Sequence, residues 1–110
     1  MPVETKEMNE GVALVVVSGR LVLGKEVEAL ENAVNQLLPS NPRLVILDAS
    51  GLDYADSAGI GTLVACLTSI RKTGGEMRMA GASARIKRLL QITGVDSIVA
   101  VYPTVAAATA

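Results

Sequence analysis

Hydrophobic residues along this chain recur at two spacings, and the change from one spacing to the other predicts its elements. Residues 3–8 and 12–17 have the composition of strands, the second being rich in β-branched residues. The turn-forming segment 9–11 between them predicts a hairpin. Gly19 and Gly24 then bracket a predicted loop.

From Lys25 the hydrophobic spacing becomes helical, and the prolines at 39 and 42 end the predicted helix. Its expected inward face consists of Val27, Leu30, Val34 and Leu37. The continuous apolar run 44–47 is typical of a strand that is buried on both faces.

A second helix is predicted over residues 58–72, ended by the glycines at 74 and 75. Its expected core face consists of Ile60, Leu63, Val64, Leu67 and Ile70. A strand at 76–80, a short helix capped by Ser83 and continuing to Ile92, and a strand at 98–101 follow. Pro103 suits the first turn of a final Ala-rich helix. The order β-β-α-β-α-β-α-β-α predicts one α/β domain over residues 1–110, with a mixed sheet that begins with the hairpin and continues with parallel strands, packed with four helices.

Composition narrows the function. A net charge of −1 and only two aromatic residues argue against nucleic-acid binding, which needs a basic surface or stacking rings. No apolar run approaches the roughly 20 residues of a membrane span, and the polar N-terminus does not resemble a signal peptide, so we expect no membrane insertion. A single cysteine, Cys66, points to a reducing cytoplasm.

The chain contains no histidine. A Ser-His-Asp triad therefore cannot form within it, a zinc site is improbable, and the usual general base near neutral pH is missing. We therefore expect that the protein is not an enzyme and binds neither a metal nor a cofactor.

Two motifs that resemble catalytic or nucleotide sites fail on chemistry. The stretch GRLVLGKE (19–26) matches GxxxxGK, but Glu26 stands where a phosphate-binding loop needs Ser or Thr. The stretch ADSAG (55–59) has the strand-turn-helix setting of a nucleophile elbow, but no histidine can serve as its base. Cys66 is expected to pack in the core, and a solvated face is expected for the cations Arg71, Lys72, Arg85, Lys87 and Arg88.

Ser57 leaves two interpretations open. Its hydroxyl could cap the second helix, a contribution of about 1 kcal/mol, although Asp56 could cap it instead. A cap does not explain Gly59 and Gly61, which weaken a helix by up to about 1 kcal/mol each. These glycines could instead bare the surface around Ser57 for another protein, and a helix N-terminus can accommodate an added phosphate.

The stretch VILDASGLDYADSAGIGTLV (45–64) resembles the signature of the STAS domain, the sulfate transporter and anti-sigma factor antagonist family. The segments VSGRL (17–21), KTGGEMRMAG (72–81) and IKRLLQITGV (86–95) resemble other family positions. Coverage of the chain by one such domain leads us to expect a stand-alone bacterial anti-sigma factor antagonist.

The resemblance implies a phosphorylation switch. Ser57 matches the serine that a partner anti-sigma factor, itself an ATP-dependent serine kinase, phosphorylates, and that a PP2C-type phosphatase restores. The unmodified antagonist binds the anti-sigma factor and frees the sigma factor. The resemblance also implies a partner-binding surface and a protein that is a monomer when alone. The residues of that surface are Asp56, Ser57, Ala58, Gly59, Ile60, Gly61, Leu23 and Gly24.

The chain departs from sporulation-type family members at Val22, which stands where they carry an acidic residue that helps to engage the kinase. Alternatives therefore stay open. The domain could be a phosphorylation-independent accessory subunit of a membrane transporter, or a scaffold in a stress-signalling complex.

Overall fold

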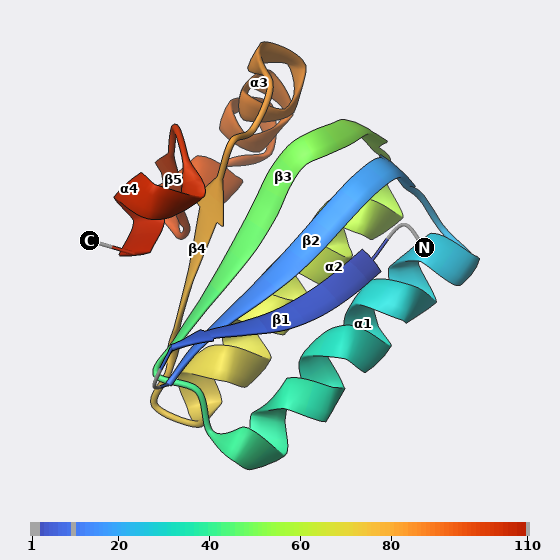
Figure 1. Cartoon of the computed structure of the whole chain (residues 1–110). Helices are drawn as coiled ribbons and strands as arrows, with labels where there is room; N and C mark the ends of the chain where they lie inside the picture. The colour runs from blue at the N-terminus through green and yellow to red at the C-terminus, as the bar shows by residue number, and fades with distance from the viewer. Residues whose placement is uncertain (1–2, 10, 110) are drawn as a thin grey trace.

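Five strands form one mixed sheet in the spatial order β1-β2-β3-β4-β5 (Figure 1). The structure is a computed structural model that describes residues 3–9 and 11–109. β1 runs antiparallel to β2, and each later neighbouring pair is parallel. The strands are β1 (Val3–Asn9), β2 (Val12–Leu21), β3 (Leu44–Ala55), β4 (Glu76–Ala80) and β5 (Ala100–Tyr102).

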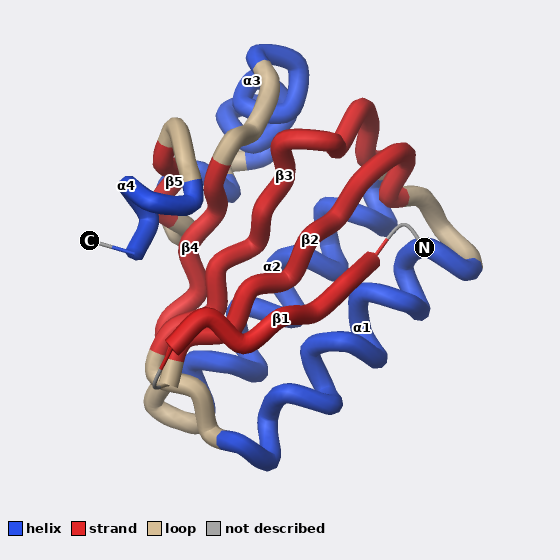
Figure 2. The backbone as a smooth tube through the Cα atoms, viewed as in Figure 1, coloured by secondary structure: helices blue, strands red, loops and turns tan. Residues whose placement is uncertain are grey.

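Four helices follow strands β2 to β5, as Figure 2 shows in blue, and the first three connect the parallel strands. They are α1 (Lys25–Leu37), α2 (Ser57–Lys72), α3 (Ala84–Thr93) and α4 (Val105–Thr109), with short 3₁₀ turns at Leu38–Ser40 and Val95–Ser97. The predicted order of strands and helices is confirmed. Ser83 caps α3 as expected, because its hydroxyl accepts the Ile86 N–H at 3.2 Å.

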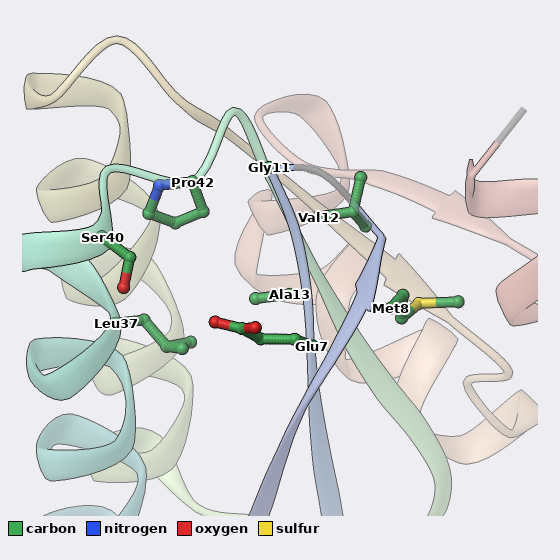
Figure 3. Close-up of a pocket in the computed structure, with 8 residues that line it drawn as sticks. All are labelled: Glu7, Met8, Gly11, Val12, Ala13, Leu37, Ser40 and Pro42. Atoms are coloured by element: carbon green, nitrogen blue, oxygen red, sulfur yellow. The ribbon is translucent and has the colours of Figure 1, made fainter.

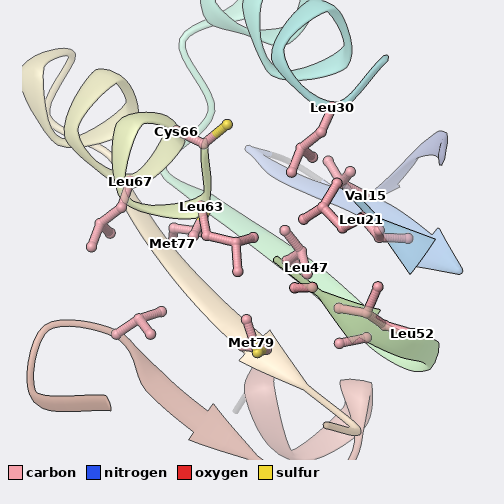
Figure 4. Packing of buried hydrophobic residues seen from close by; sticks show 14 of the residues in the cluster. Val15, Leu21, Leu30, Leu47, Leu52, Leu63, Cys66, Leu67, Met77 and Met79 are labelled. Atoms are coloured by element: carbon pink, nitrogen blue, oxygen red, sulfur yellow. The ribbon is translucent and has the colours of Figure 1, made fainter. Parts of the chain in front are cut away.

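The main core lies between the sheet and the helices α1 and α2, and α3 contributes at one end (Figure 4). Side chains alternate along each strand, so one face of β3 supplies Val45 and Leu47 to this core. A smaller cluster on the opposite face packs Ile46 under Ala108 of α4. Arg78 holds α4 to this face, because its guanidinium donates to the Ala108 carbonyl oxygen at 2.7 Å.

Strands β2 and β3 extend further than the sequence predicts. Gly19 lies inside β2 with a φ of +75° rather than opening a loop, and β3 continues for 12 residues to Ala55. The ladder between them shifts register twice, once between Val16 and Ser18 and again between Gly19 and Arg20. These irregularities bend the two strands. The strands stay paired up to their carboxyl ends, where the candidate site lies.

Two smaller differences concern the C-terminal part. β5 covers Ala100–Tyr102 and not 98–101, because residues 95–97 form a 3₁₀ turn first. Pro103 precedes α4 instead of lying in its first turn. Thr104 caps the helix, since its hydroxyl oxygen accepts the Ala107 N–H at 3.0 Å.

The parallel arrangement determines where the functional residues meet. The carboxyl ends of β2 and β3 are paired at Leu21 and Ala55, so the β2–α1 loop (22–24) lies beside the β3–α2 junction. The described chain therefore brings together two segments that are more than 30 residues apart in sequence.

Candidate functional site

Asp56 connects β3 to α2 and joins the two segments of the site. It is the N-cap of α2, and its Oδ1 accepts the Gly59 N–H at 2.8 Å. Its Oδ2 accepts the Leu23 N–H at 3.1 Å. Its own N–H donates to the Leu21 carbonyl oxygen at 3.3 Å. One half-buried carboxylate thus bonds both to the start of α2 and to the β2–α1 loop.

Ser57 is the first residue of α2 and is exposed. Over residues 3–9 and 11–109 its hydroxyl has no hydrogen-bond partner, whereas the capping bond of α2 is made by Asp56. The interpretation of Ser57 as the helix cap is therefore wrong. An exposed hydroxyl at a helix N-terminus is accessible to a modifying enzyme, and the helix dipole there favours negative charge.

The two glycines that follow have different roles. A Cβ atom on Gly59 would lie 2.1 Å from the Leu21 carbonyl oxygen, so this glycine allows β2 to approach α2. Our interpretation that it bares a surface for a partner is wrong for this position. Gly61 fits that interpretation, because it is exposed and a Cβ atom there would meet nothing within 4 Å.

The remaining predicted partner-binding residues divide between surface and core. Leu23 is 76% exposed, an unusual position for a leucine, and Gly24 beside it is exposed with a φ of +120°. Ala58 is half-buried. Ile60 is only 7% exposed and packs in the main core, so it offers little surface to another protein. The exposed part of the predicted surface consists of Leu23, Gly24, Ser57 and Gly61.

Hydrogen bonding stabilises the ionised form of Asp56. The N–H of Leu23, followed by that of Gly59, lowers the pKa of Asp56 below its usual value. Asp56, like an ordinary aspartate, is ionised at neutral pH, and these two bonds favour its charged form. Elsewhere in α2, burial raises the pKa of the Cys66 thiol to about 11, which keeps it protonated and agrees with its expected packing role.

Sequence reasoning missed two contacts at this site. The Arg20 guanidinium lies 4.8 Å from the centroid of the Tyr54 ring, a cation–π contact between the paired ends of β2 and β3. The second contact that was missed is the bond between Asp56 and the Leu23 N–H. The partners are 34 and 33 positions apart in sequence and meet only through the register of β2 against β3. No local sequence pattern indicates such a contact.

No metal site accompanies these residues. Within the described part of the chain, no three His, Cys, Asp or Glu side chains are grouped so as to hold a metal ion. A hollow of about 440 Å³ lies between the β1–β2 hairpin and the end of α1, lined in part by Glu7 and Leu37 (Figure 3). It lies at the opposite end of the sheet from Ser57. Among the residues described, no helix is both long and apolar enough to cross a membrane.

Fold and site together define a small α/β domain whose candidate site is an exposed surface rather than a pocket. The chain belongs to the STAS domain family, whose sequence pattern matches residues 5–108. A Staphylococcus aureus protein named anti-sigma-B factor antagonist is 29% identical over 72 residues, which cover 66% of this chain and 67% of that protein. A Thermotoga neapolitana protein, named as a candidate anti-sigma factor antagonist, is 33% identical over 64 residues. That match covers 58% of this chain and only 57% of the relative.

Solved structures show the same fold. A crystal structure of an anti-sigma factor antagonist from Mycobacterium paratuberculosis has a TM-score of 0.76 and 27% identity, and the match covers 94% of this chain and 87% of that one. The Bacillus cell fate determinant SpoIIAA, in its phosphorylated form, has a TM-score of 0.76 with 15% identity. The SpoIIAA match covers 97% of this chain and 96% of that one, and it shows similarity of fold.

Proposed function

We propose that this protein is an anti-sigma factor antagonist that binds its partner while Ser57 is unmodified and releases it when Ser57 is phosphorylated. The observation that carries the proposal is the exposed Ser57 hydroxyl, which makes no hydrogen bond within the described chain. Ser57 is the first residue of a 16-residue helix. The names of the relatives support the class of function. The partner we propose is an anti-sigma factor that is also an ATP-dependent serine kinase.

The exposed residues have the chemistry of a switchable binding surface. Leu23 presents an apolar side chain in the loop that Asp56 holds beside α2, and Gly61 leaves room for close approach. Phosphate on Ser57 would add about −1.5 to −2 charges next to the ionised Asp56. A partner surface matched to leucine and an uncharged serine would then bury an unpaired charge, at a cost of roughly 3–5 kcal/mol.

The fold itself tolerates this modification. Ser57 occupies the first turn of α2, where the helix dipole stabilises negative charge. Its side chain is exposed, so the phosphate remains hydrated in the free protein. Phosphorylation should therefore change binding and leave the structure intact. A PP2C-type phosphatase would restore the binding form, and ATP and magnesium would belong to the kinase.

The test is a phosphorylation assay with a kinase-type anti-sigma factor from the same organism. Purified protein is incubated with that factor, ATP and magnesium, and the phosphate is located by mass spectrometry. We expect one phosphate, on Ser57, and none on the Ser57→Ala variant. Ser97→Ala is the matched control, because Ser97 is also exposed, and it should be phosphorylated like wild type.

Phosphate on a different serine, or none at all, would contradict the switch. Genes for a permease and an ATPase next to this one, in place of an anti-sigma factor, would favour the accessory subunit of a transporter.

A further inference from the structure

Asp56 uses its two carboxylate oxygens for two different purposes. Oδ1 accepts the Gly59 N–H within α2, which is the bond that a helix cap requires. Oδ2 accepts the N–H of Leu23, a residue 33 positions earlier in the chain. Capping needs only the first of these bonds. The second bond is a separate feature, and it joins the β2–α1 loop to the start of α2.

The β2–α1 loop has few other interactions to hold its tip. Leu23 is 76% exposed, so its side chain contributes little packing. Gly24 has a φ of +120° and room around it, so nothing packs against that position. The tip is joined to α1 by the Gly24 carbonyl oxygen, which accepts the Glu28 N–H at 3.0 Å. The bond from the Leu23 N–H to Asp56 is the contact that ties this leucine to the start of α2.

We infer that Asp56 is a positioning residue, whose carboxylate holds the exposed Leu23 beside Ser57 so that the two residues form one binding surface. The link between Asp56 and Leu23 belongs to the free protein, and its role in binding rests on the proposed function. Asp56 acts through Leu23. It orders the leucine before the partner arrives, so that less conformational entropy is lost on binding.

The link can be tested in the free protein by NMR. Both amides donate to one carboxylate, so the amide proton shifts of Leu23 and Gly59 should change together as the pH is lowered. They should share one midpoint, lower than that of an ordinary aspartate. A Leu23 amide that does not titrate, or that titrates with a different midpoint from Gly59, would overturn the inference. Capping alone would move only Gly59.

Substitution separates the two bonds of Asp56. In Asp56→Ser the hydroxyl is also a good helix cap, but it is shorter and offers one oxygen where the carboxylate offered two. Hydrogen exchange at the Leu23 amide should then be about tenfold faster or more, with the Gly59 amide protected as in wild type. Asp53→Ser is the matched control. Asp53 is exposed and has no bonded partner within residues 3–9 and 11–109, so neither amide should change.

A second variant keeps the test decisive if Asp56→Ser folds poorly. Asparagine is an equally good cap, but its amide group has only one oxygen acceptor, so Asp56→Asn can keep one bond and not both. The shared titration should disappear, and whichever of the Leu23 and Gly59 amides loses its bond should exchange faster. Wild-type exchange at both amides in folded Asp56→Asn, or at Leu23 in folded Asp56→Ser, would overturn the inference.

Calorimetric titration with the anti-sigma factor used above tests the role in binding. Asp56→Ser should bind about tenfold more weakly than Asp53→Ser, although both carry an unmodified Ser57. Equal binding by the two variants, with Leu23 loosened only in the first, would overturn the positioning role. Failure of wild-type protein to bind would instead contradict the proposed function, and the link would still stand on the NMR result.

Discussion

The two glycines in the first turns of α2 differ in whether the packing of the chain requires them. Gly59 is required by the chain itself, since a Cβ atom there would lie 2.1 Å from the Leu21 carbonyl oxygen. Gly61 has open space around it and is not required by packing. The sequence shows two equivalent helix-weakening residues. Only the position of β2 against α2 distinguishes them, and for this reason sequence reasoning assigned both to a partner.

Alanine substitution should therefore have opposite effects at the two positions. Gly61→Ala should raise the free energy of unfolding by about 0.5–1 kcal/mol, because alanine is the better helix former. Gly59→Ala should lower it by about 1–3 kcal/mol or more, because the methyl group forces β2 and α2 apart. Urea denaturation measures both. Equal effects at the two positions would contradict the close approach of β2 to α2.

Removal of the Ser57 hydroxyl should cost little stability. Asp56 already provides the cap, so Ser57→Ala should change the free energy of unfolding by less than about 0.5 kcal/mol in a thermal melt. Asp56→Ala is the comparison, and it should lose about 1 kcal/mol or more. A larger loss for Ser57→Ala than for Asp56→Ala would return the capping role to the serine.

At the scale of elements, local patterns predicted the helices well and the long strands poorly. The helical spacing located α1 and α2 because each has one buried stripe. β3 was predicted only as 44–47. Its second half places Ala49, Leu52 and Ala55 toward the core at intervals of three, because the register shifts against β2. The alternation of period two that predicts a strand is lost there, so the sequence pattern indicates a loop in this part.

The orientation of α2 against the sheet can be tested by substitution. Leu63 and Leu67 are 1% and 2% exposed and lie against the sheet (Figure 4). Leu63→Ala and Leu67→Ala should each lower the free energy of unfolding by about 2–5 kcal/mol. Thr68→Ala, on the exposed side of the same helix, should change it by less than about 0.5 kcal/mol. Denaturant melts that fail to separate Leu67 from Thr68 would contradict this orientation.

At the scale of the whole molecule, the sheet supports an exposed site at the carboxyl ends of its interior strands β2 and β3. The core extends across β1 to β4 and contains Cys66, which is 4% exposed. The order of elements followed from the sequence. The joining of the β2–α1 loop to α2 did not, because it depends on the assembled sheet.

Cys66 provides a probe of this global stability. With a pKa of about 11, roughly one thiol in a thousand is ionised at pH 8, and burial also blocks access. Iodoacetamide should label the native protein at least about 100-fold more slowly than the urea-unfolded protein, because labelling needs extensive unfolding. Stability should also fall as the pH rises from about 9 toward 11, because the unfolded thiol ionises first. Rapid labelling of the native protein would contradict the burial of Cys66.

The central claim of the proposed function is that the charge at Ser57 decides whether this protein holds its partner. The most direct measurement is calorimetric titration of the anti-sigma factor into wild type, Ser57→Ala and Ser57→Asp. The account predicts that Ser57→Ala binds as tightly as wild type. It predicts that Ser57→Asp, although equally stable or slightly more so, binds at least about tenfold more weakly, a loss of about 1.4 kcal/mol. Wild-type affinity in Ser57→Asp would contradict the account.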